Sequence, residues 1–240
     1  MSPALSVGSV VASAATPQTV LLTGFDAFGG ASVNSSWLAV SALDGRTIEG
    51  CKIVAACLPT TFANSVEELS RLVVLHQPIL VICTGEAGNR SAISIERIAI
   101  NVNDARIPDN LGAQPVDQPV VESGSAAYFA SLPIKSMLLA LQNAGLKAEI
   151  SHTAGTFVCN HVFYGLMHLL EASAGTAHSA GRQITRGGFI HLPCLPALPG
   201  LGDKSESQTA LSKLVLALKI CVSSALLNSC DIAYEAGQTS

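Results

Sequence analysis

Charge is scarce in this chain. Only 12% of its 240 residues are Asp, Glu, Lys or Arg, about half the usual share. A surface with so few charges indicates that other subunits cover part of it, so we expect a homo-oligomer. The formal net charge is −4 and no cluster of Lys and Arg is present. This argues against a nucleic-acid partner, because a phosphate backbone requires a concentrated basic face.

Long apolar runs, paired cysteine spacing and an export signal are also lacking. Lys219 interrupts the most apolar stretch, 214–227, so no run reaches the roughly 18 apolar residues of a membrane-spanning helix and we expect no membrane association. The seven cysteines are odd in number and none has C-x-x-C spacing. They indicate a reduced, cytoplasmic protein without disulfides, and no Cys/His spacing suggests a bound metal. Residues 1–18 lack the positively charged region with which a signal peptide begins, and we expect them to form a disordered tail.

Residues 19–240 alternate between strand-like and helix-like patterns, with no linker and no internal repeat. This order predicts a single α/β domain, a sheet with helices on both faces. Strands are expected at 19–24, 51–58, 78–83, 94–102, 148–151 and 188–192; helices are expected to begin near 34, 65, 133 and 159, with a last one over 211–227. Residues 103–125 are rich in Pro and Gly and predict a long loop, which in compact domains is often functional.

Cys159 stands where a turn of small residues becomes an amphipathic helix. The segment reads Thr153-Ala-Gly-Thr-Phe-Val-Cys-Asn-His161, and apolar residues then recur at three and four positions. Unpaired N–H groups and the helix dipole at such a position favour a thiolate. The pattern therefore predicts a nucleophile with a lowered pKa. The alternative is a small buried core residue, a common place for a free cysteine.

A nucleophilic cysteine requires a base, and the base requires an orienting group. His191 closes an apolar strand and His152 precedes the turn, so both are candidates for the base. His161 lies two residues after Cys159 on the same helix and points away from it.

Candidates for the orienting acid are Glu96, Asp104 and Asp109. Glu96 lies inside an expected strand beside Arg97. A carboxylate there is unusual unless it is paired, and a structural Glu–Arg pair is the alternative.

The Gly-rich segment Thr23-Gly-Phe-Asp-Ala-Phe-Gly-Gly30 does not match a phosphate-binding loop. It lacks the G-x-x-x-x-G-K-[ST] pattern, and Phe25 and Phe28 are bulky where a nucleotide loop has small residues. Two phenylalanines beside glycines suit a small, flat, apolar pocket.

Four segments together resemble those of the pyroglutamyl peptidase I (pyrrolidone-carboxylate peptidase) family. They are residues 21–30 with Asn34, 94–110, 153–161 and 188–193, in the same order along the chain. The resemblance runs from Val20 to about Pro196. Members remove an N-terminal pyroglutamyl residue from peptides, need no cofactor, and are commonly homotetramers. Their fold is an α/β/α sandwich, which implies a twisted, mostly parallel mixed sheet here.

The resemblance also implies roles for individual residues. Cys159 would be the nucleophile, His191 the base and Glu96 the orienting acid, with hydrolysis through a thioester acyl-enzyme. The implied substrate-binding residues are Phe25, Phe28, Asn34, Glu86, Arg106, Phe157 and Val158.

The chain departs from the family at three places. Glu86 stands where Gln or an apolar residue is usual, Cys194 stands where Tyr is common, and 197–210 does not match closely. We expect ligand contact at Glu86 through its backbone rather than its side chain. Two other functions remain open on the sequence, a hydrolase of another small cyclic amide or ester and a pyroglutamyl-binding protein without turnover.

Overall fold

Seven strands form the central sheet of the computed structural model, which describes residues 17–179, 183–195 and 204–237. In spatial order they are β2 (Thr47–Ile48), β3 (Cys51–Leu58), β1 (Thr19–Phe25), β4 (Leu80–Ala87), β9 (Arg186–Pro193), β5 (Ile93–Glu96) and β8 (Ala148–Ser151). The pairs β1–β3, β1–β4, β4–β9 and β5–β8 are parallel, whereas β2–β3 and β5–β9 are antiparallel. Most of the predicted tail, residues 1–16, lies outside the described residues.

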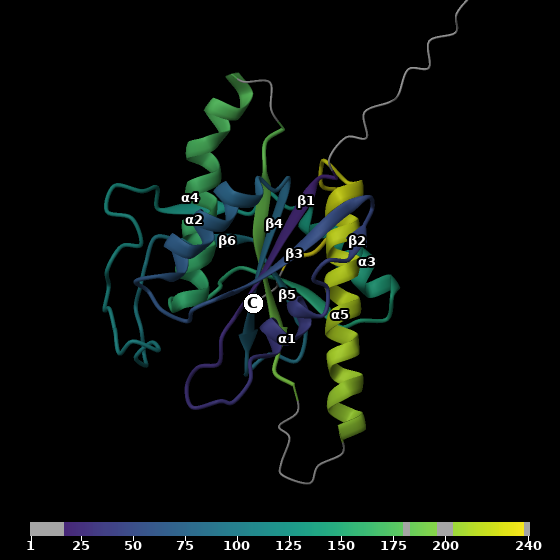
Figure 1. Ribbon diagram of the computed structural model, residues 1–240, viewed down its shortest axis with the longest axis horizontal. Coiled ribbons are helices and arrows are strands. Elements are labelled where there is room, and N and C mark those ends of the chain that lie inside the picture. The colour runs from purple at the N-terminus through teal and green to yellow at the C-terminus, as the bar shows by residue number, and fades with distance from the viewer. Residues whose placement is uncertain (1–16, 180–182, 196–203, 238–240) are drawn as a thin grey trace, which may run out of the picture.

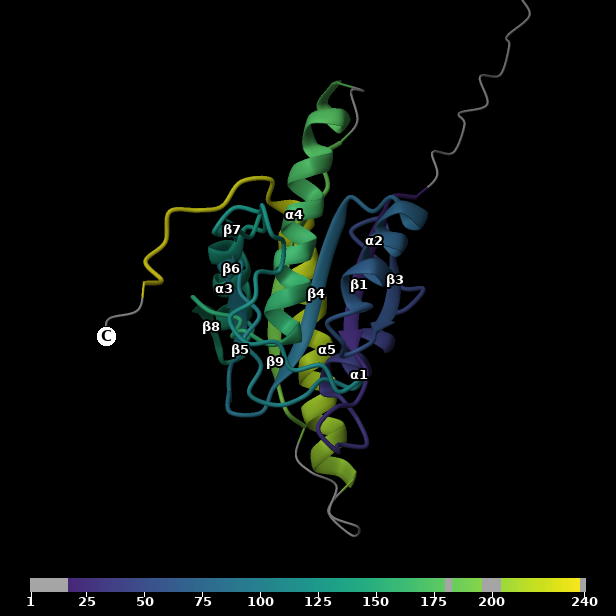
Figure 2. The ribbon, with the colours of Figure 1, turned by 90° about the vertical axis from the view of Figure 1, so that its left-hand side faces the viewer.

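Within the described part of the chain, five helices cover the two faces of this sheet. On one face lie α1 (Ser35–Ser41), α3 (Ile134–Asn143) and α5 (Lys204–Leu227), and on the other lie α2 (Ser65–His76) and α4 (Val158–Ser179). Figure 1 shows the sheet between α2 and α4 on one side and α3 and α5 on the other, and Figure 2 shows α4 crossing in front of the strands. The predicted α/β/α sandwich with a mixed, mostly parallel sheet is confirmed.

The two faces differ in the side chains that they bury. The buried cluster under α1, α3 and α5 is aliphatic, built from residues such as Leu22, Ile82 and Met137. The cluster under α2 and α4 contains four buried aromatic residues, Phe25, Phe163, Tyr164 and Phe189. In this face the chain gathers most of its few aromatic rings.

The expected strand over 94–102 is in fact two strands. β5 ends at Glu96, and β6 (Ile98–Ile100) pairs with β7 (Ala127–Phe129) in a separate two-stranded sheet. Between them Arg97 donates its N–H to Ser151 O and accepts from Ala130 N. The chain changes partners at this residue, and a pattern of alternating side chains does not record such a change.

The helix α5 is longer than expected, and its Ser205–Leu227 part is long and apolar enough to span a membrane by length and composition alone. The interruption at Lys219 does not lower the mean hydropathy of this helix enough to exclude it by that criterion. Leu214, Leu218, Cys221 and Val222 on this helix are buried in the aliphatic cluster. Packing within this cluster, chiefly beside α1 and α3, therefore accounts for the apolar face of α5.

The helix α1 lies unusually close to β1. A Cβ added at Gly24 would be 2.6 Å from Trp37 N, so only glycine allows this approach. Asn34 caps the helix, because its Oδ1 accepts from Ser36 N at 3.0 Å, as is common for Asn at this position. The cap and the glycine fix the start of α1 at the carboxyl end of β1.

Candidate active site

Cys159 is the second residue of α4, as the sequence predicted for a helix start. The turn before it passes through Gly155, whose φ of 80° favours glycine. The helix begins with His161 N donating to Phe157 O at 3.1 Å. The N–H groups of Val158, Cys159 and Asn160 precede that bond and have no partner four residues earlier in the helix.

The thiol of Cys159 lies against the backbone of Gly85 on β4. A Cβ added at Gly85 would be 2.7 Å from Cys159 Sγ and 2.9 Å from the ring of Phe189. Gly85 is also the register partner of His191 on the neighbouring parallel strand β9. Register partners project their side chains from the same face of a sheet. The sheet therefore presents His191 on the face where the thiol lies.

His191 and Glu96 form a buried pair. His191 Nδ1 lies 2.7 Å from Glu96 Oε1, and the side chains are 6% and 0% exposed. Because a carboxylate only accepts, Nδ1 is the protonated nitrogen of this pair. Nε2 of the neutral ring is then free to accept a proton.

The predicted lowering of the Cys159 pKa is wrong. Burial raises the pKa of this thiol to about 12, with the Glu96 carboxylate adding to the rise, while Arg90 opposes it. Loss of water around the sulfur outweighs the helix start on which the prediction rested. The resting group is therefore a thiol, which becomes a nucleophile only when a base removes its proton.

The structure separates the candidate bases. His152 is exposed at the end of β8. His161 is buried and turned away from the site, with Nδ1 3.1 Å from Asn103 Oδ1. Of the three, His191 has a carboxylate partner among the described residues.

The structure also separates the candidate acids. Asp104 is exposed, and its backbone N–H and C=O bond Thr156. Asp109 is buried, where its carboxylate accepts from three backbone N–H groups, those of Phe62, Leu111 and Ala113. Asp109 thus fixes the loop of residues 101–126, and Glu96 alone of the three bonds His191.

A narrow cavity adjoins the thiol. Cys159 and Thr60 line it, together with six of the seven residues expected to bind substrate. These six are Phe25, Phe28, Asn34, Glu86, Phe157 and Val158. The rings of Phe28 and Phe157 lie 6.3 Å apart. The lining is mainly apolar and aromatic, as expected for a small flat ligand.

Asp26 organises one rim of this cavity. Its Oδ1 accepts from Thr60 N at 2.7 Å and from Asn110 Nδ2 at 3.2 Å. Its backbone oxygen accepts from Asn34 Nδ2 at 3.0 Å. No sequence pattern pointed to Thr60, which follows β3 and lies at the cavity through this network.

The seventh expected residue, Arg106, lies elsewhere. It is exposed in the loop of residues 101–126 and does not line the cavity. The structure thus does not bring Arg106 to the thiol.

Glu86 uses its side chain within the protein. Its Oε2 accepts from Ser35 N, the first residue of α1, at 2.7 Å. The carboxylate therefore supplements the Asn34 cap at a helix start, where negative charge is favourable. It also raises the pKa of the neighbouring Cys194 thiol, for which burial is the larger cause.

Two further residues hold the site, and the sequence patterns assigned a role to neither. Asn160 is fully buried and bonds β6 and the segment after it: its Oδ1 accepts from Ile100 N, and its Nδ2 donates to Ile100 O and Val102 O. Arg90, from the loop between β4 and β5, donates to Glu96 Oε1 at 2.7 Å. Asn160 could have been singled out in the sequence because it directly follows the predicted nucleophile. Nothing in the sequence distinguishes Arg90 from other loop residues.

The chain matches known proteins over most of its length. A family model for pyroglutamyl peptidase matches residues 18–228. The chain is 48% identical over 220 residues to a pyrrolidone-carboxylate peptidase of Cupriavidus taiwanensis, covering 92% of this chain and 98% of that protein. It is 47% identical to the pyrrolidone-carboxylate peptidase of Erwinia tasmaniensis, with the same coverage.

Solved structures agree with the sequence relatives. Pyroglutamyl peptidase I from Bacillus amyloliquefaciens superposes with a TM-score of 0.79 at 43% identity, covering 92% of this chain and all of that one. A variant pyrrolidone carboxyl peptidase from Pyrococcus furiosus gives 0.74 at 33% identity, covering 88% and 99%. A family match of this extent, on a fold that brings a cysteine, a histidine–glutamate pair and an aromatic cavity together, places the chain in the pyroglutamyl peptidase family.

Proposed function

We propose that this chain hydrolyses the N-terminal pyroglutamyl residue from peptides, with Cys159 as nucleophile, His191 as base and Glu96 as orienting acid. One observation carries the assignment: the Cys159 thiol lies against Gly85, the register partner of His191, and also lines a small aromatic cavity. Pyroglutamate is a five-membered lactam without a charged amine. A cavity lined by Phe25, Phe28 and Phe157 suits such a ring, whereas a charged N-terminus would lose its hydration there.

The first half of the reaction forms a thioester. His191 Nε2 takes the thiol proton as Sγ attacks the acyl carbon, and the Glu96 carboxylate stabilises the imidazolium. The developing oxyanion accepts from free N–H groups at the start of α4. Each such donor contributes roughly 3 kcal/mol to transition-state stabilisation.

The second half releases the acid. The imidazolium protonates the leaving amine, which frees the peptide, and the ring is neutral again. It then takes a proton from water, whose oxygen attacks the thioester. Pyroglutamate leaves, and the proton returns to the sulfur.

A chromogenic amide tests the assignment. Release of the amine from an L-pyroglutamyl amide is compared with release from the prolyl and glutamyl amides. We expect turnover of the first alone, because proline lacks the lactam carbonyl and glutamate carries charge. Equal turnover of the prolyl amide would contradict recognition of the lactam, and turnover of another cyclic amide in place of the pyroglutamyl amide would support the other hydrolase function.

Matched histidine variants test the base. We expect His191→Ala to abolish turnover with circular dichroism unchanged, and His152→Ala, at an exposed position, to retain most of it. Binding of pyroglutamate without turnover by the unaltered chain would instead indicate a binding protein.

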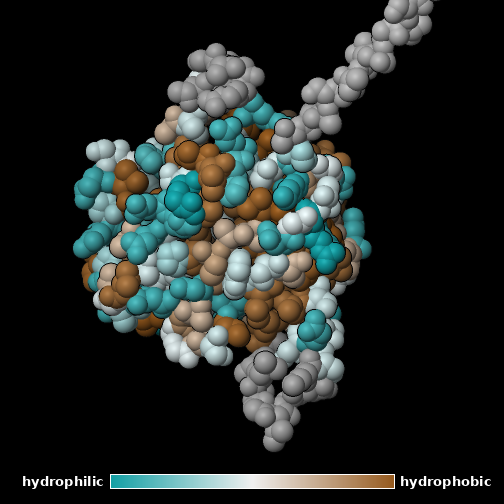
Figure 3. Space-filling model, in the orientation of Figure 1, coloured by the Kyte–Doolittle hydropathy of each residue, from teal (hydrophilic) through white to brown (hydrophobic). Residues whose placement is uncertain are grey.

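We further propose that the chain assembles as a homo-oligomer, the tetramer that the family resemblance implies. Apolar side chains are exposed at Val74 and Leu75 on α2, which are 70% and 61% exposed, and at Phe129 on β7. Figure 3 shows hydrophobic residues spread over the middle of one face. Light scattering decides this, since a mass near the monomer's 24.7 kDa at micromolar concentration would exclude an oligomer.

A cytoplasmic location is proposed on the cysteines. All seven are free, and three of them, Cys57, Cys194 and Cys230, are exposed. Exposed thiols persist in reducing compartments. Fractionation of cells, with the activity followed in each fraction, tests the location.

A further inference from the structure

Glu96 accepts from two side chains. Its Oε1 lies 2.7 Å from His191 Nδ1 and also 2.7 Å from Arg90 Nη1. Glu96 Oε2 is buried and has no hydrogen-bond partner among the described residues. The whole interaction of this carboxylate with the protein therefore passes through one oxygen that two donors share.

Arg90 bonds a second element at the same time. Its Nη2 donates to Thr153 O at 2.8 Å, in the turn that leads into Cys159. Thr153 O also accepts from Ser151 Oγ at the end of β8. One guanidinium thus links the acid on β5 to the turn that sets the start of α4, with its two nitrogens in the fork geometry that Lys cannot reproduce.

A buried carboxylate requires a counter-charge to remain ionised. With His191 as the sole partner, ionised Glu96 would favour the protonated imidazolium, and an imidazolium cannot take the proton of a thiol. Arg90 carries its charge at every physiological pH. It therefore supplies a counter-charge that does not depend on whether His191 is protonated.

We propose that Arg90 is a positioning residue that keeps Glu96 ionised while His191 is neutral, and that fixes the turn before the nucleophile. The inference rests on the proposed function. The thiol is also surrounded by titratable groups: Glu96 from β5, Glu86 and Cys83 from β4, and His191 from β9. Arg90 adds a permanent positive charge to these groups. Its side chain is only 21% exposed, so solvent screens this charge incompletely.

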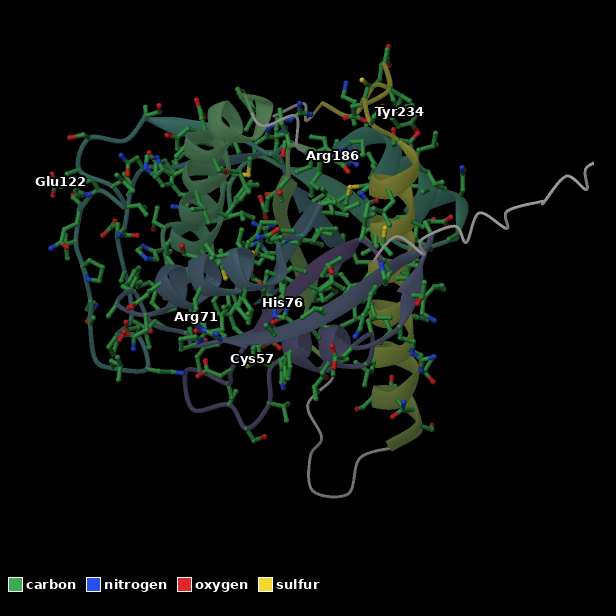
Figure 4. The ribbon with its side chains drawn as sticks, turned by 45° about the horizontal axis from the view of Figure 1, so that its top comes forward. Cys57, Arg71, His76, Glu122, Arg186 and Tyr234 are labelled. Carbon is green, nitrogen blue, oxygen red and sulfur yellow. The ribbon has the colours of Figure 1, made fainter. Side chains whose placement is uncertain are left out.

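The experiment compares Arg90→Met and Arg90→Lys with a matched surface control. Arg71 on α2, labelled in Figure 4, forms an ion pair with Glu68 at the same 2.7 Å, but these side chains are 59% and 33% exposed. For Arg90→Met we expect kcat to fall about 10- to 100-fold, as for outer partners that orient a functional histidine, with KM changed less than about threefold. Arg90→Lys should recover part of kcat, because it restores the charge but not the second bond. Arg71→Met should leave both constants unchanged.

The pH profile separates this role from a structural one. Without Arg90, His191 stays protonated to higher pH, so the acidic limb of kcat/KM moves upward in Arg90→Met and less in Arg90→Lys. A purely structural loss would lower the profile without moving it. An unmoved limb in a folded Arg90→Met, or kcat within twofold of the unaltered chain, would overturn the proposal. If Arg90→Met fails to fold, the limb of Arg90→Lys decides.

Alkylation gives a readout that does not depend on the substrate. We expect iodoacetamide to label Cys159 more slowly at pH 8 in Arg90→Met than in Arg71→Met, as followed by mass-spectrometric mapping. If the unaltered chain cleaves no pyroglutamyl amide but the labelling rates differ as expected, the proposed function fails and the role of Arg90 stands. If the chain cleaves the amide and the rates are equal, the role of Arg90 fails alone.

Discussion

The face of the sheet under α1, α3 and α5 buries aliphatic side chains, whereas the face under α2 and α4 buries four aromatic rings among its aliphatic side chains. The rings of the second face form a connected series. Phe189 lies 5.9 Å from Phe163, 6.5 Å from Phe25 and 4.9 Å from the His191 ring, measured between centroids. The series joins the core of α4 to the cavity wall at Phe25 and to the proposed base.

This difference separates two tasks. Aliphatic side chains fill a core and tolerate changes that conserve volume. Rings have few rotamers and large flat contacts, so they hold a neighbouring group in one orientation. A chain with only 5% aromatic residues thus gathers them beside the groups whose positions catalysis requires.

The largest expected effect compares two cysteines on opposite faces. Cys159→Ala should lower kcat/KM at least about 1,000-fold, because it removes the attacking atom. Cys221→Ala, in the aliphatic cluster, removes a sulfur from a fully buried side chain. It should leave kcat/KM within twofold and lower the free energy of unfolding by about 1 kcal/mol. Steady-state kinetics and urea unfolding of both variants measure this, and a comparable loss of activity in the two would remove the functional distinction between the faces.

The second expected effect is a pH dependence of the free energy of unfolding, caused by His161 on the aromatic face. Burial lowers the pKa of His161 to about 4, whereas the unfolded residue titrates near 6.5. Between these values the unfolded chain binds a proton that the folded chain does not, so stability is fully present above about 6.5 and is lost as pH falls toward 4. The loss amounts to roughly 3 kcal/mol at most.

Urea unfolding at several pH values checks this. His161→Gln cannot titrate and should flatten the dependence, while His152→Gln, at an exposed position, should not. An unchanged slope in His161→Gln would assign the acid sensitivity to other groups.

The third prediction concerns the close approach of the Cys159 sulfur to the backbone of β4. Gly85→Ala would place a methyl group 2.7 Å from Cys159 Sγ, so the sulfur must move. We expect kcat/KM to fall about 100-fold, since displacement by about 1 Å costs that much. Gly175→Ala on α4, where an added Cβ meets nothing within 4 Å, is the control and should retain full activity. Full activity in Gly85→Ala would show that the thiol tolerates displacement.

The smallest expected effect is at Glu86. Because Glu86 Oε2 accepts from Ser35 N, a glutamine oxygen can make the same bond. Glu86→Gln should change kcat/KM by less than about tenfold, or roughly 1.4 kcal/mol, and Glu86→Ala should lose more by removing the cap. A gain well beyond tenfold in Glu86→Gln, with the pH optimum moving upward, would show that the carboxylate faces the substrate.

The sequence was sufficient for the features that local patterns encode. Strand β3 and the helix start at Cys159 lie where the apolar patterns and the turn of small residues predicted them. Motif resemblance identified the pair Glu96 and His191, which are 95 residues apart in the chain. Spacing alone had left His152, Asp104 and Asp109 open, because only the folded sheet decides which side chains meet.

Features that depend on tertiary contact were missed. The raised pKa of Cys159 comes from loss of water around the sulfur, which a helix position does not reveal. The break at Arg97 reflects a change of strand partner, and Arg90 is distinguished only by what it contacts. Asp109 looked like a candidate acid because a carboxylate serves a loop and an active site equally well in sequence.

The close approach of α1 to β1 has an optical consequence. Trp37 is the single tryptophan of the chain, and it lies on α1 beside Gly24. Two residues earlier, Ser35 is bound by Glu86, which lines the cavity. Emission excited at the indole band therefore comes from one fluorophore, mounted on the element that a ligand in the cavity would disturb. Titrating pyroglutamate into Cys159→Ala and following that emission would record occupancy of the cavity without a label and without turnover.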